Sequence, residues 1–268
     1  MQASSKMSTI SLLLKNYMSI VLKTPDEVAV IRRAGGILAE ILNACGAAAK
    51  PGMSTFEVDQ IARTMCNERG VIPGFLNYHG FSGAMCTSVN DQVVHCIPSK
   101  EKILQDGDIL KLDFGVAIDG WNSDACQTFA VGTINPAAEK LMKITKEALY
   151  KGIDQAIIGN RIGDIGHAVE THVVPHGYSP VRECVGHGIG RRLHEDPEVP
   201  NWGSPGTGPK IVEGMVICIE PIINIGTHKI ITEADHWTTR TADGELSAHF
   251  EHTLYITPDG PEILTPWE

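Results

Sequence analysis

The sequence has few cysteines, no long apolar run and few basic residues, and each of these shortages argues against a class of protein. Seven cysteines are spread between Cys45 and Cys218 without a CxxC pair, which argues against a disulfide framework or a zinc finger. No apolar run approaches the roughly 18 residues of a membrane span. Lys and Arg number 22 against 32 acidic residues, so no basic face for nucleic acid is expected. We therefore expect a soluble, cytoplasmic protein with neither a membrane nor nucleic acid as direct partner.

What is present is a patterned chain with a large core. Its 268 residues are 43% hydrophobic, enough for one large core or two fused halves. Apolar residues recur at helical spacing in four segments: 28–49, 56–70, 137–157 and 158–173. Residues 1–17 precede this pattern, and we expect a poorly ordered extension there, followed by a single domain over 18–268.

The chain resembles itself at an offset of 107 positions. The run DGDILKLD (106–113) then falls on EGMVICIE (213–220), and Gly52 falls on Gly159. One offset that serves several segments predicts two similar halves, about 28–135 and 136–268, each with helices and antiparallel strands. Chance similarity between two generic α/β stretches is the alternative. The repeat places Asp113 on Glu220, an acid at the same point of each half.

Asp113 stands within an apolar strand, in the run LKLDFGVAIDGWNSDA (110–125). Asp119-Gly120 predicts a two-residue hairpin turn, which places Asp113 opposite Cys126 and Asp124 opposite Gly115. Because side chains alternate along a strand, Asp113 and Asp124 then share one face and converge.

Converging carboxylates repel one another unless a cation holds them ionised. A solvated pair of surface acids is the simpler explanation for two of them. Glu220 and Glu251 are two further acids in strand-like apolar settings, and four such acids favour a metal site. His187 lies between glycines in VGHGIGRRLHEDP, which also contains His194. Carboxylates with one imidazole suit Mn, Fe, Co or Zn, and four acids carry enough charge for two ions.

Five motifs in order resemble a type I methionine aminopeptidase of the bacterial kind. They are SVNDQVVHCIP (88–98), LDFG with SDACQTF, GHGIGRRLHEDP, ICIEPI and SAHFEHT. The resemblance runs from about Met18 to the C-terminus and implies an α+β class, the pita-bread (creatinase/aminopeptidase-like) fold. In that fold two αβ halves are related by a pseudo-two-fold, with the antiparallel sheet inside and the helices outside. Residues 1–17 have no counterpart in the family.

The resemblance also implies a dinuclear metal site. Asp124 and Glu251 would bridge two divalent ions. Asp113 would hold one of the ions, and His187 with Glu220 would hold the other. The implied activity is removal of the N-terminal methionine from peptides and nascent chains that have a small second residue. The implied attack on the first peptide bond is by a hydroxide that bridges the metals, and the substrates would be met at the ribosome by a monomeric enzyme.

Catalytic and substrate-binding residues follow from the same resemblance. His95 would contact substrate and stabilise the transition state, His194 would hydrogen-bond the scissile carbonyl, and Glu220 would carry the proton. The methionine pocket and substrate edge would be formed by Phe75, Tyr78, His79, Phe81, Cys86, Leu193 and Trp237.

Two positions depart from the family pattern. Cys96 stands in HCIP where glycine is usual, which could displace His95 or narrow the cleft. Phe75 occupies a position often held by a smaller residue, so we expect a tighter pocket. A prolidase-like X-Pro peptidase and a non-catalytic pita-bread binding protein are the alternatives. The first usually has an additional N-terminal domain, and the second has generally lost metal ligands.

Overall fold

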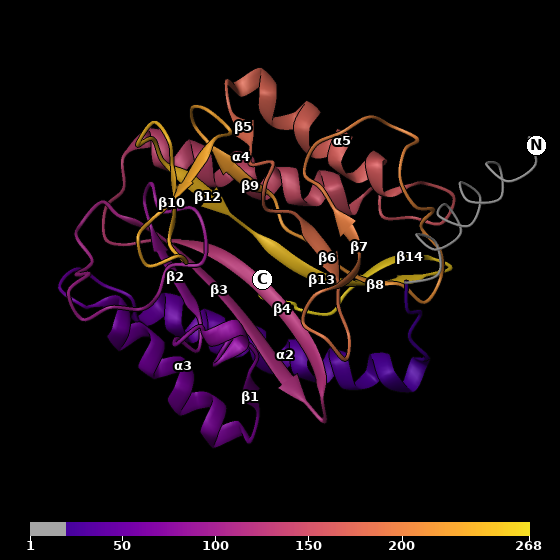
Figure 1. The fold of residues 1–268 in the computed structure, drawn as a ribbon, viewed down its shortest axis with the longest axis horizontal. Coiled ribbons are helices and arrows are strands. Elements are labelled where there is room, and N and C mark those ends of the chain that lie inside the picture. The colour runs from indigo at the N-terminus through magenta and orange to yellow at the C-terminus, as the bar shows by residue number, and fades with distance from the viewer. Residues whose placement is uncertain (1–19) are drawn as a thin grey trace, which may run out of the picture.

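The computed structural model describes residues 20–268, so the predicted extension over residues 1–17 lies outside the described part. No helix within the described part is long and apolar enough to cross a membrane. Figure 1 shows a central curved sheet with one pair of helices beside its first strands and a second pair at the opposite side. This is the α+β pita-bread architecture that the motifs implied.

The first helix pair begins and ends at capping residues. Helix α2 (Pro25–Ala48) starts with a capping box between Thr24 and Glu27. Helix α3 (Thr55–Arg69) starts with a second capping box, between Ser54 and Glu57, and ends at Gly70 in the left-handed conformation. These boxes satisfy the free N–H groups of a first helical turn. Both helices follow the predicted segments to within a few residues.

Both helices of the second pair are shorter than the apolar segments from which they were predicted. Helix α4 (Pro136–Ile153) ends four residues before the end of the predicted segment, and helix α5 (Ile162–Val173) begins four residues inside its own segment. Asp154 follows α4, where an acid interacts unfavourably with the helix dipole. The residues between the two helices form turns that leave Ile157 and Ile158 exposed. Apolar content alone therefore overestimated both helices.

Fourteen strands and two short 3₁₀ helices complete the described chain. The main sheet contains nine strands, seven of which run in the order β1-β3-β4-β13-β8-β6-β7; β2 pairs with β3, and β14 with β13. Their bounds are β1 (Ile72–Pro73), β2 (Cys86–Val89), β3 (Ile109–Ile118), β4 (Trp121–Ala130), β6 (Gly186–Gly188), β7 (Glu195–Val199), β8 (Val216–Ile219), β13 (Glu251–Thr257) and β14 (Gly260–Ile263). The remaining elements are β5 (Ser179–Pro180), β9 (Ile222–Asn224), β10 (Ile230–Thr232), β11 (Thr239–Thr241), β12 (Ser247–His249), η1 (Tyr78–Gly80) and η2 (Val174–His176).

The β3–β4 hairpin has the predicted register. Asp113 pairs with Cys126, and Gly115 pairs with Asp124. The turn at Asp119 and Gly120 has positive φ at both residues, as a type I′ hairpin turn requires. The alternate face of β3, from Leu110 to Val116, is fully buried against α2, which packs on both strands of the hairpin. The hairpin is therefore fixed on one side by the core, and it presents its acids on the other side.

The two halves meet where β4 pairs with β13. Helices α3 and α5 begin at Thr55 and Ile162, and strands β3 and β8 begin at Ile109 and Val216. Both pairs of starting residues are separated by 107 positions (162 − 55 and 216 − 109), the offset of the sequence repeat. The site lies at the junction of the two halves.

Candidate metal centre and substrate cavity

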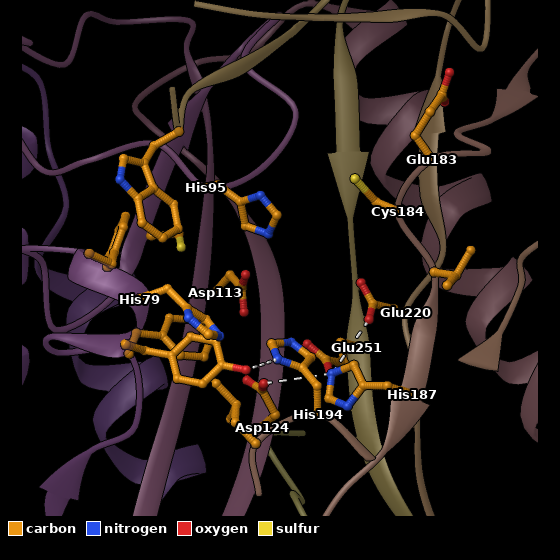
Figure 2. A pocket seen from close by; sticks show the side chains of 17 residues that line it. His79, His95, Asp113, Asp124, Glu183, Cys184, His187, His194, Glu220 and Glu251 are labelled. Carbon is orange, nitrogen blue, oxygen red and sulfur yellow. Dashed lines mark hydrogen bonds and ion pairs between the residues drawn. The ribbon is translucent and has the colours of Figure 1, made fainter. Parts of the chain in front are cut away.

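One cavity of about 440 Å³ contains all the residues that were predicted for the site. It opens over the strands where the halves meet, as Figure 2 shows. The predicted residues that line it are Phe75, Tyr78, His79, Phe81, Cys86, His95, Asp113, Asp124, His187, Leu193, His194, Glu220, Trp237 and Glu251. They come from both halves of the chain, so the fold brings together side chains that are up to 176 positions apart (251 − 75).

Three adjacent strands carry three of the acids in neighbouring positions. Asp113 on β3 pairs with Cys126 on β4, and Cys126 pairs on its other side with Glu251 on β13. Asp124 lies two residues from Cys126 on β4, so it points to the same face. Carboxylate oxygens of Asp113, Asp124 and Glu251 all lie within 4.8 Å of one another. The sheet register, rather than any loop, therefore builds the acidic cluster.

Glu220 and His187 approach this cluster from the second half. Glu220 directly follows β8, and its Oε1 lies 3.7 Å from His187 Nε2. The same nitrogen lies 4.0 Å from Asp124 Oδ2. His187 Nδ1 lies 3.0 Å from the Gly188 carbonyl oxygen, and a proton on Nδ1 can be donated to that oxygen. The lone pair of Nε2 then faces the acids, which is the arrangement of a metal-ligating histidine.

Burial makes this cluster unfavourable unless a cation is bound. It raises the pKa of Asp113 to about 7 and that of Glu220 to about 8, where repulsion by Asp113 adds to the effect. Burial and repulsion by neighbouring acids also raise the pKa values of Asp124 and Glu251 well above the usual range. Burial lowers the pKa of His187 to about 3, so its imidazole is neutral.

Several carboxylate oxygens of the cluster have no hydrogen-bond partner among the described residues. They are Asp113 Oδ1, Asp124 Oδ1 and Glu251 Oε1, all buried. Buried polar atoms are normally hydrogen-bonded or bound to metal. Carboxylate oxygens with one neutral imidazole suit hard or borderline divalent ions. The residues present therefore fit a divalent metal centre.

His194 stands beside this centre and is oriented by an aromatic hydroxyl. Its Nδ1 lies 2.8 Å from Tyr78 Oη, and its ring centroid lies 4.3 Å from that of His187. When the Tyr78 hydroxyl donates to Nδ1, the proton of the neutral ring is on Nε2. His194 Nε2–H is then free to donate to a substrate carbonyl. His95 reaches the cavity from the other wall, with a positive φ of 60°.

The other end of the cavity is apolar and aromatic. Phe75, Phe81 and Leu193 are buried there in one cluster, against which Tyr78 and Trp237 pack. The rings of Phe81 and Trp237 meet edge to face, with centroids 5.2 Å apart. The space beside the acids is therefore suited to an unbranched apolar side chain.

Cys96 does not line this cavity among the described residues. Its side chain is buried, and its Sγ lies 3.6 Å from the Val94 carbonyl oxygen. The Cys96 side chain points into the protein and does not narrow the cleft, whereas displacement of His95 by this residue stays a prediction.

Some residues of the site were not predicted from the sequence. Glu183, Cys184 and Val185 line the cavity, and their position directly before the GHG motif was the available signal. His249 Nε2 lies 3.6 Å from Glu220 Oε2, and the Cys218 sulfur lies within 4.8 Å of an imidazole nitrogen of His187 and a carboxylate oxygen of Glu251. Neither residue carried a spacing that distinguished it from ordinary strand residues.

Comparison with known proteins identifies the family. The model of metallopeptidase family M24 matches residues 29–258. The chain belongs to this family. Methionine aminopeptidase from Clostridium acetobutylicum is 48% identical over 246 residues, which are 92% of this chain and 98% of the relative. Methionine aminopeptidase 1 from Bacillus subtilis is 46% identical, over 92% of this chain and 99% of the relative. The resemblance to methionine aminopeptidases is therefore confirmed.

Solved structures agree with this assignment to family M24. Methionine aminopeptidase from Thermotoga maritima superimposes with a TM-score of 0.90 at 39% identity, over 92% of this chain and 99% of that chain. The prolidase from Pyrococcus horikoshii has a TM-score of 0.73 at 22% identity, and this chain covers only 64% of it. The prolidase likeness extends to the fold alone, so the prolidase-like alternative is not favoured.

Proposed function

We propose that the chain is a metal-dependent aminopeptidase that removes the N-terminal methionine from peptides and nascent proteins, with preference for a small second residue. The observation that carries this proposal is the single cavity that joins a carboxylate–histidine cluster to an aromatic, apolar end. Methionine is unbranched and polarizable, and it packs well against aromatic rings. The cluster beside it is where the first peptide bond and the free amine would lie.

The proposed centre holds two divalent ions, of Mn, Fe, Co or Zn. Asp113, Asp124, His187, Glu220 and Glu251 are the residues that would hold them. When bound, the ions would supply activation of water and polarisation of the scissile carbonyl. The support in this chain is the set of buried carboxylate oxygens without hydrogen-bond partners and the free Nε2 of His187.

Three side chains would perform the remaining steps. His194 donates Nε2–H to the scissile carbonyl oxygen, in the tautomer that the Tyr78 hydroxyl favours. Glu220 accepts a proton from the attacking water and passes it to the leaving amine, a role that its carboxylate can fill from its position beside the acidic cluster. His95 contacts the substrate from the opposite wall of the cavity.

Three peptides test this function against its alternatives. We expect the metal-loaded protein to release methionine from Met-Ala-Ser but not from N-acetyl-Met-Ala-Ser, which lacks a free amine. Ala-Pro should remain intact. Cleavage of Ala-Pro would support the prolidase-like alternative, and binding of Met-Ala-Ser without release of methionine would support a non-catalytic protein.

The setting of the reaction is proposed from the same family relation. We propose that the enzyme acts in the cytoplasm as a monomer and meets its nascent substrates at the ribosome.

A further inference from the structure

Lys111 is a fully buried lysine that the proposed reaction does not use. It lies on β3, two residues before Asp113 and on the same face, and only 1% of its surface is exposed. Its Nζ donates to two backbone carbonyls, Asn90 O at 2.6 Å and Ser247 O at 2.7 Å. Within residues 20–268, no carboxylate oxygen lies within 4.0 Å of this ammonium.

The two carbonyls belong to different halves of the chain. Asn90 follows β2 in the first half, and Ser247 begins β12 in the second half. The Asn90 carbonyl also accepts a hydrogen bond from the Ser247 N–H at 3.2 Å. One ammonium and one amide therefore meet at the same oxygen and join the two halves at this point.

Asn90 is held in place beside β3 by its own side chain and amide, and its N–H donates to Ile109 O at 3.0 Å. Its φ is positive, at 55°, a conformation that asparagine tolerates better than most residues. Its side chain donates to Asp108 Oδ1 at 2.7 Å and accepts from the Ile109 N–H at 3.0 Å. Rotation of the peptide after Asn90 would break the contacts of its carbonyl to Lys111 and to the Ser247 N–H.

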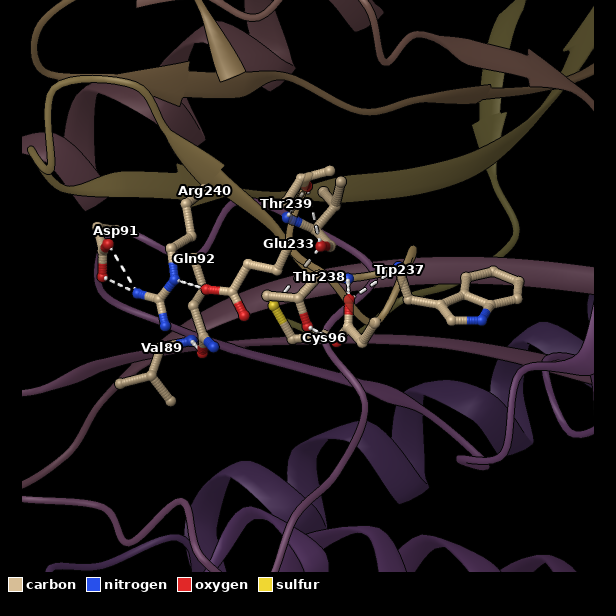
Figure 3. Close-up of polar contacts among 11 residues, drawn as sticks. Val89, Asp91, Gln92, Cys96, Glu233, Trp237, Thr238, Thr239 and Arg240 are labelled. Atoms are coloured by element: carbon tan, nitrogen blue, oxygen red, sulfur yellow. Dashed lines mark hydrogen bonds and ion pairs between the residues drawn. The ribbon is translucent and has the colours of Figure 1, made fainter. Parts of the chain in front are cut away.

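Asn90 begins the segment that carries His95. The outer side of this segment pairs with β11, because the Val93 N–H donates to Thr239 O at 2.7 Å. Figure 3 shows one end of this pairing, where the half-buried Arg240 bridges Asp91 and Glu233. Lys111 contacts the segment from the inside of the molecule, where the Thr87 N–H also donates to Cys96 O at 3.0 Å at the far end of the segment. Lys111 is therefore the interior contact that also reaches the second half of the chain.

Burial of a lysine ammonium group is energetically unfavourable. Burial lowers the pKa of Lys111 to about 7, because a charged group in an apolar interior loses its hydration. The hydrogen bonds from Lys111 to the two carbonyl oxygens offset the free-energy cost of burying the ammonium. An apolar residue at position 111 would leave both carbonyls without this donor, which is a local cost at the base of the His95 loop.

We infer that Lys111 is a positioning residue whose ammonium ties the loop carrying His95 to the strand that leads to Glu251 in the other half. Ser247 lies four residues before Glu251, so the tether sets the distance between the substrate-contacting wall and the acidic cluster. This inference rests on the proposed function for its kinetic consequence, but its structural consequence is independent of catalysis.

The test compares Lys111→Met with Lys143→Met. Lys143 is an exposed lysine on α4, distant from the cavity, and serves as the matched control. We expect Lys111→Met to lower kcat/KM for Met-Ala-Ser on the order of tenfold, mainly through kcat, because His95 is then poorly placed in the transition state. Manganese uptake should be retained, since the acids are held by their own strands.

A second measurement does not depend on activity. Cys96 is buried on the tethered loop, so N-ethylmaleimide should label it slowly in the wild-type protein and in Lys143→Met. Loosening of the loop in Lys111→Met should accelerate labelling of Cys96, as located by peptide mass. Unchanged labelling together with unchanged kcat/KM would overturn the inference. A wild-type protein that releases no methionine would refute the proposed function instead, and the labelling would still decide the role of Lys111.

Chemical rescue of a Lys111 variant distinguishes a positioning role of this residue from a role in folding. Lys111→Ala leaves a space that an ammonium ion can occupy and from which it can donate to both carbonyls. We expect ammonium chloride to restore kcat/KM and slow labelling of Cys96 in this variant, and tetramethylammonium, which has no N–H, to restore neither. A variant that remains unfolded in ammonium chloride, or that is folded and not rescued, would contradict the positioning role.

Discussion

At the scale of single residues, Asp113 shows why an acid stands in an apolar strand. It repels the neighbouring acids in the absence of metal, so Asp113→Asn should stabilise the metal-free protein. The same change removes a proposed ligand, and we expect manganese uptake to weaken and methionine release to fall at least on the order of 100-fold. Isothermal titration and a peptide assay measure both. Asp259→Asn, an exposed change in the β13–β14 turn, is the control, and equal activity in the two variants would refute the assignment.

The raised carboxyl pKa values predict an unusual pH dependence for the metal-free protein. Burial raises the pKa of Asp113 to about 7 and that of Glu220 to about 8, whereas carboxyls of unfolded chains titrate near 4. Between about pH 7 and pH 8, above the range near 6.5 in which the histidines of the unfolded chain titrate, the buried carboxyls of the folded chain keep protons that the unfolded chain has lost, so the free energy of unfolding should fall as the pH rises. Urea unfolding at about pH 7 and about pH 8 measures this. Higher stability at the upper pH without metal would contradict the burial of these acids.

Loss of the Tyr78 hydroxyl should impair catalysis more than substrate binding. Its hydroxyl orients His194, while its ring contributes to the apolar pocket. Tyr78→Phe keeps the ring, so we expect KM to change little and kcat to fall roughly three- to tenfold, the cost of about one hydrogen bond. Steady-state kinetics with Met-Ala-Ser provide the measurement.

Tyr150 offers a matched control for this change, because its hydroxyl lies 3.3 Å from His252 Nε2 outside the cavity. Tyr150→Phe should leave kcat unchanged. An equal loss of kcat in both variants would show that hydroxyl loss acts through stability alone.

At the scale of elements, the β3–β4 hairpin was the most predictable part of the chain. The Asp119-Gly120 turn fixes the register of two long strands, and strand alternation then places Asp113 and Asp124 on one face. These are local rules, and the structure confirms both pairings. The neighbours of the hairpin were not predictable in the same way, because pairing of β4 with β13 depends on packing between segments more than 100 positions apart.

The segment from Asn90 to Cys96 shows where sequence reasoning was insufficient. The direction of the Cys96 side chain depends on the loop backbone, including the positive φ of the preceding His95. Because Cys96 is buried away from the cavity, Cys96→Gly should leave kcat/KM within about twofold of the wild-type value. Loss of buried atoms and added backbone freedom should lower the free energy of unfolding by about 1–2 kcal/mol. A large gain in kcat/KM on Cys96→Gly would show that this thiol does obstruct the cleft.

At the scale of the whole molecule, the site exists only because two halves share one sheet. Asp113 and Asp124 come from the first half, and His187, Glu220 and Glu251 come from the second. The sequence repeat predicted equivalent acids at Asp113 and Glu220, and β3 and β8 do occupy equivalent positions. Cys218 and His249 approach the cluster from β8 and β12, and no local pattern marked them. Strand alternation did place Lys111 on the same face as Asp113, but its partners Asn90 and Ser247 could not be predicted in this way. The family motifs supplied most of the site, and the contacts between the halves supplied the rest.

The measurement that tests the central claim most directly is methionine release from Met-Ala-Ser by metal-stripped protein, titrated separately with Mn, Fe, Co and Zn. We expect no release without metal, and release that rises with the added ion until the centre formed by the four carboxylates and His187 is filled. The equivalents needed would give the number of ions. Release at full rate in the stripped protein, or none with any of the four ions, would contradict the account.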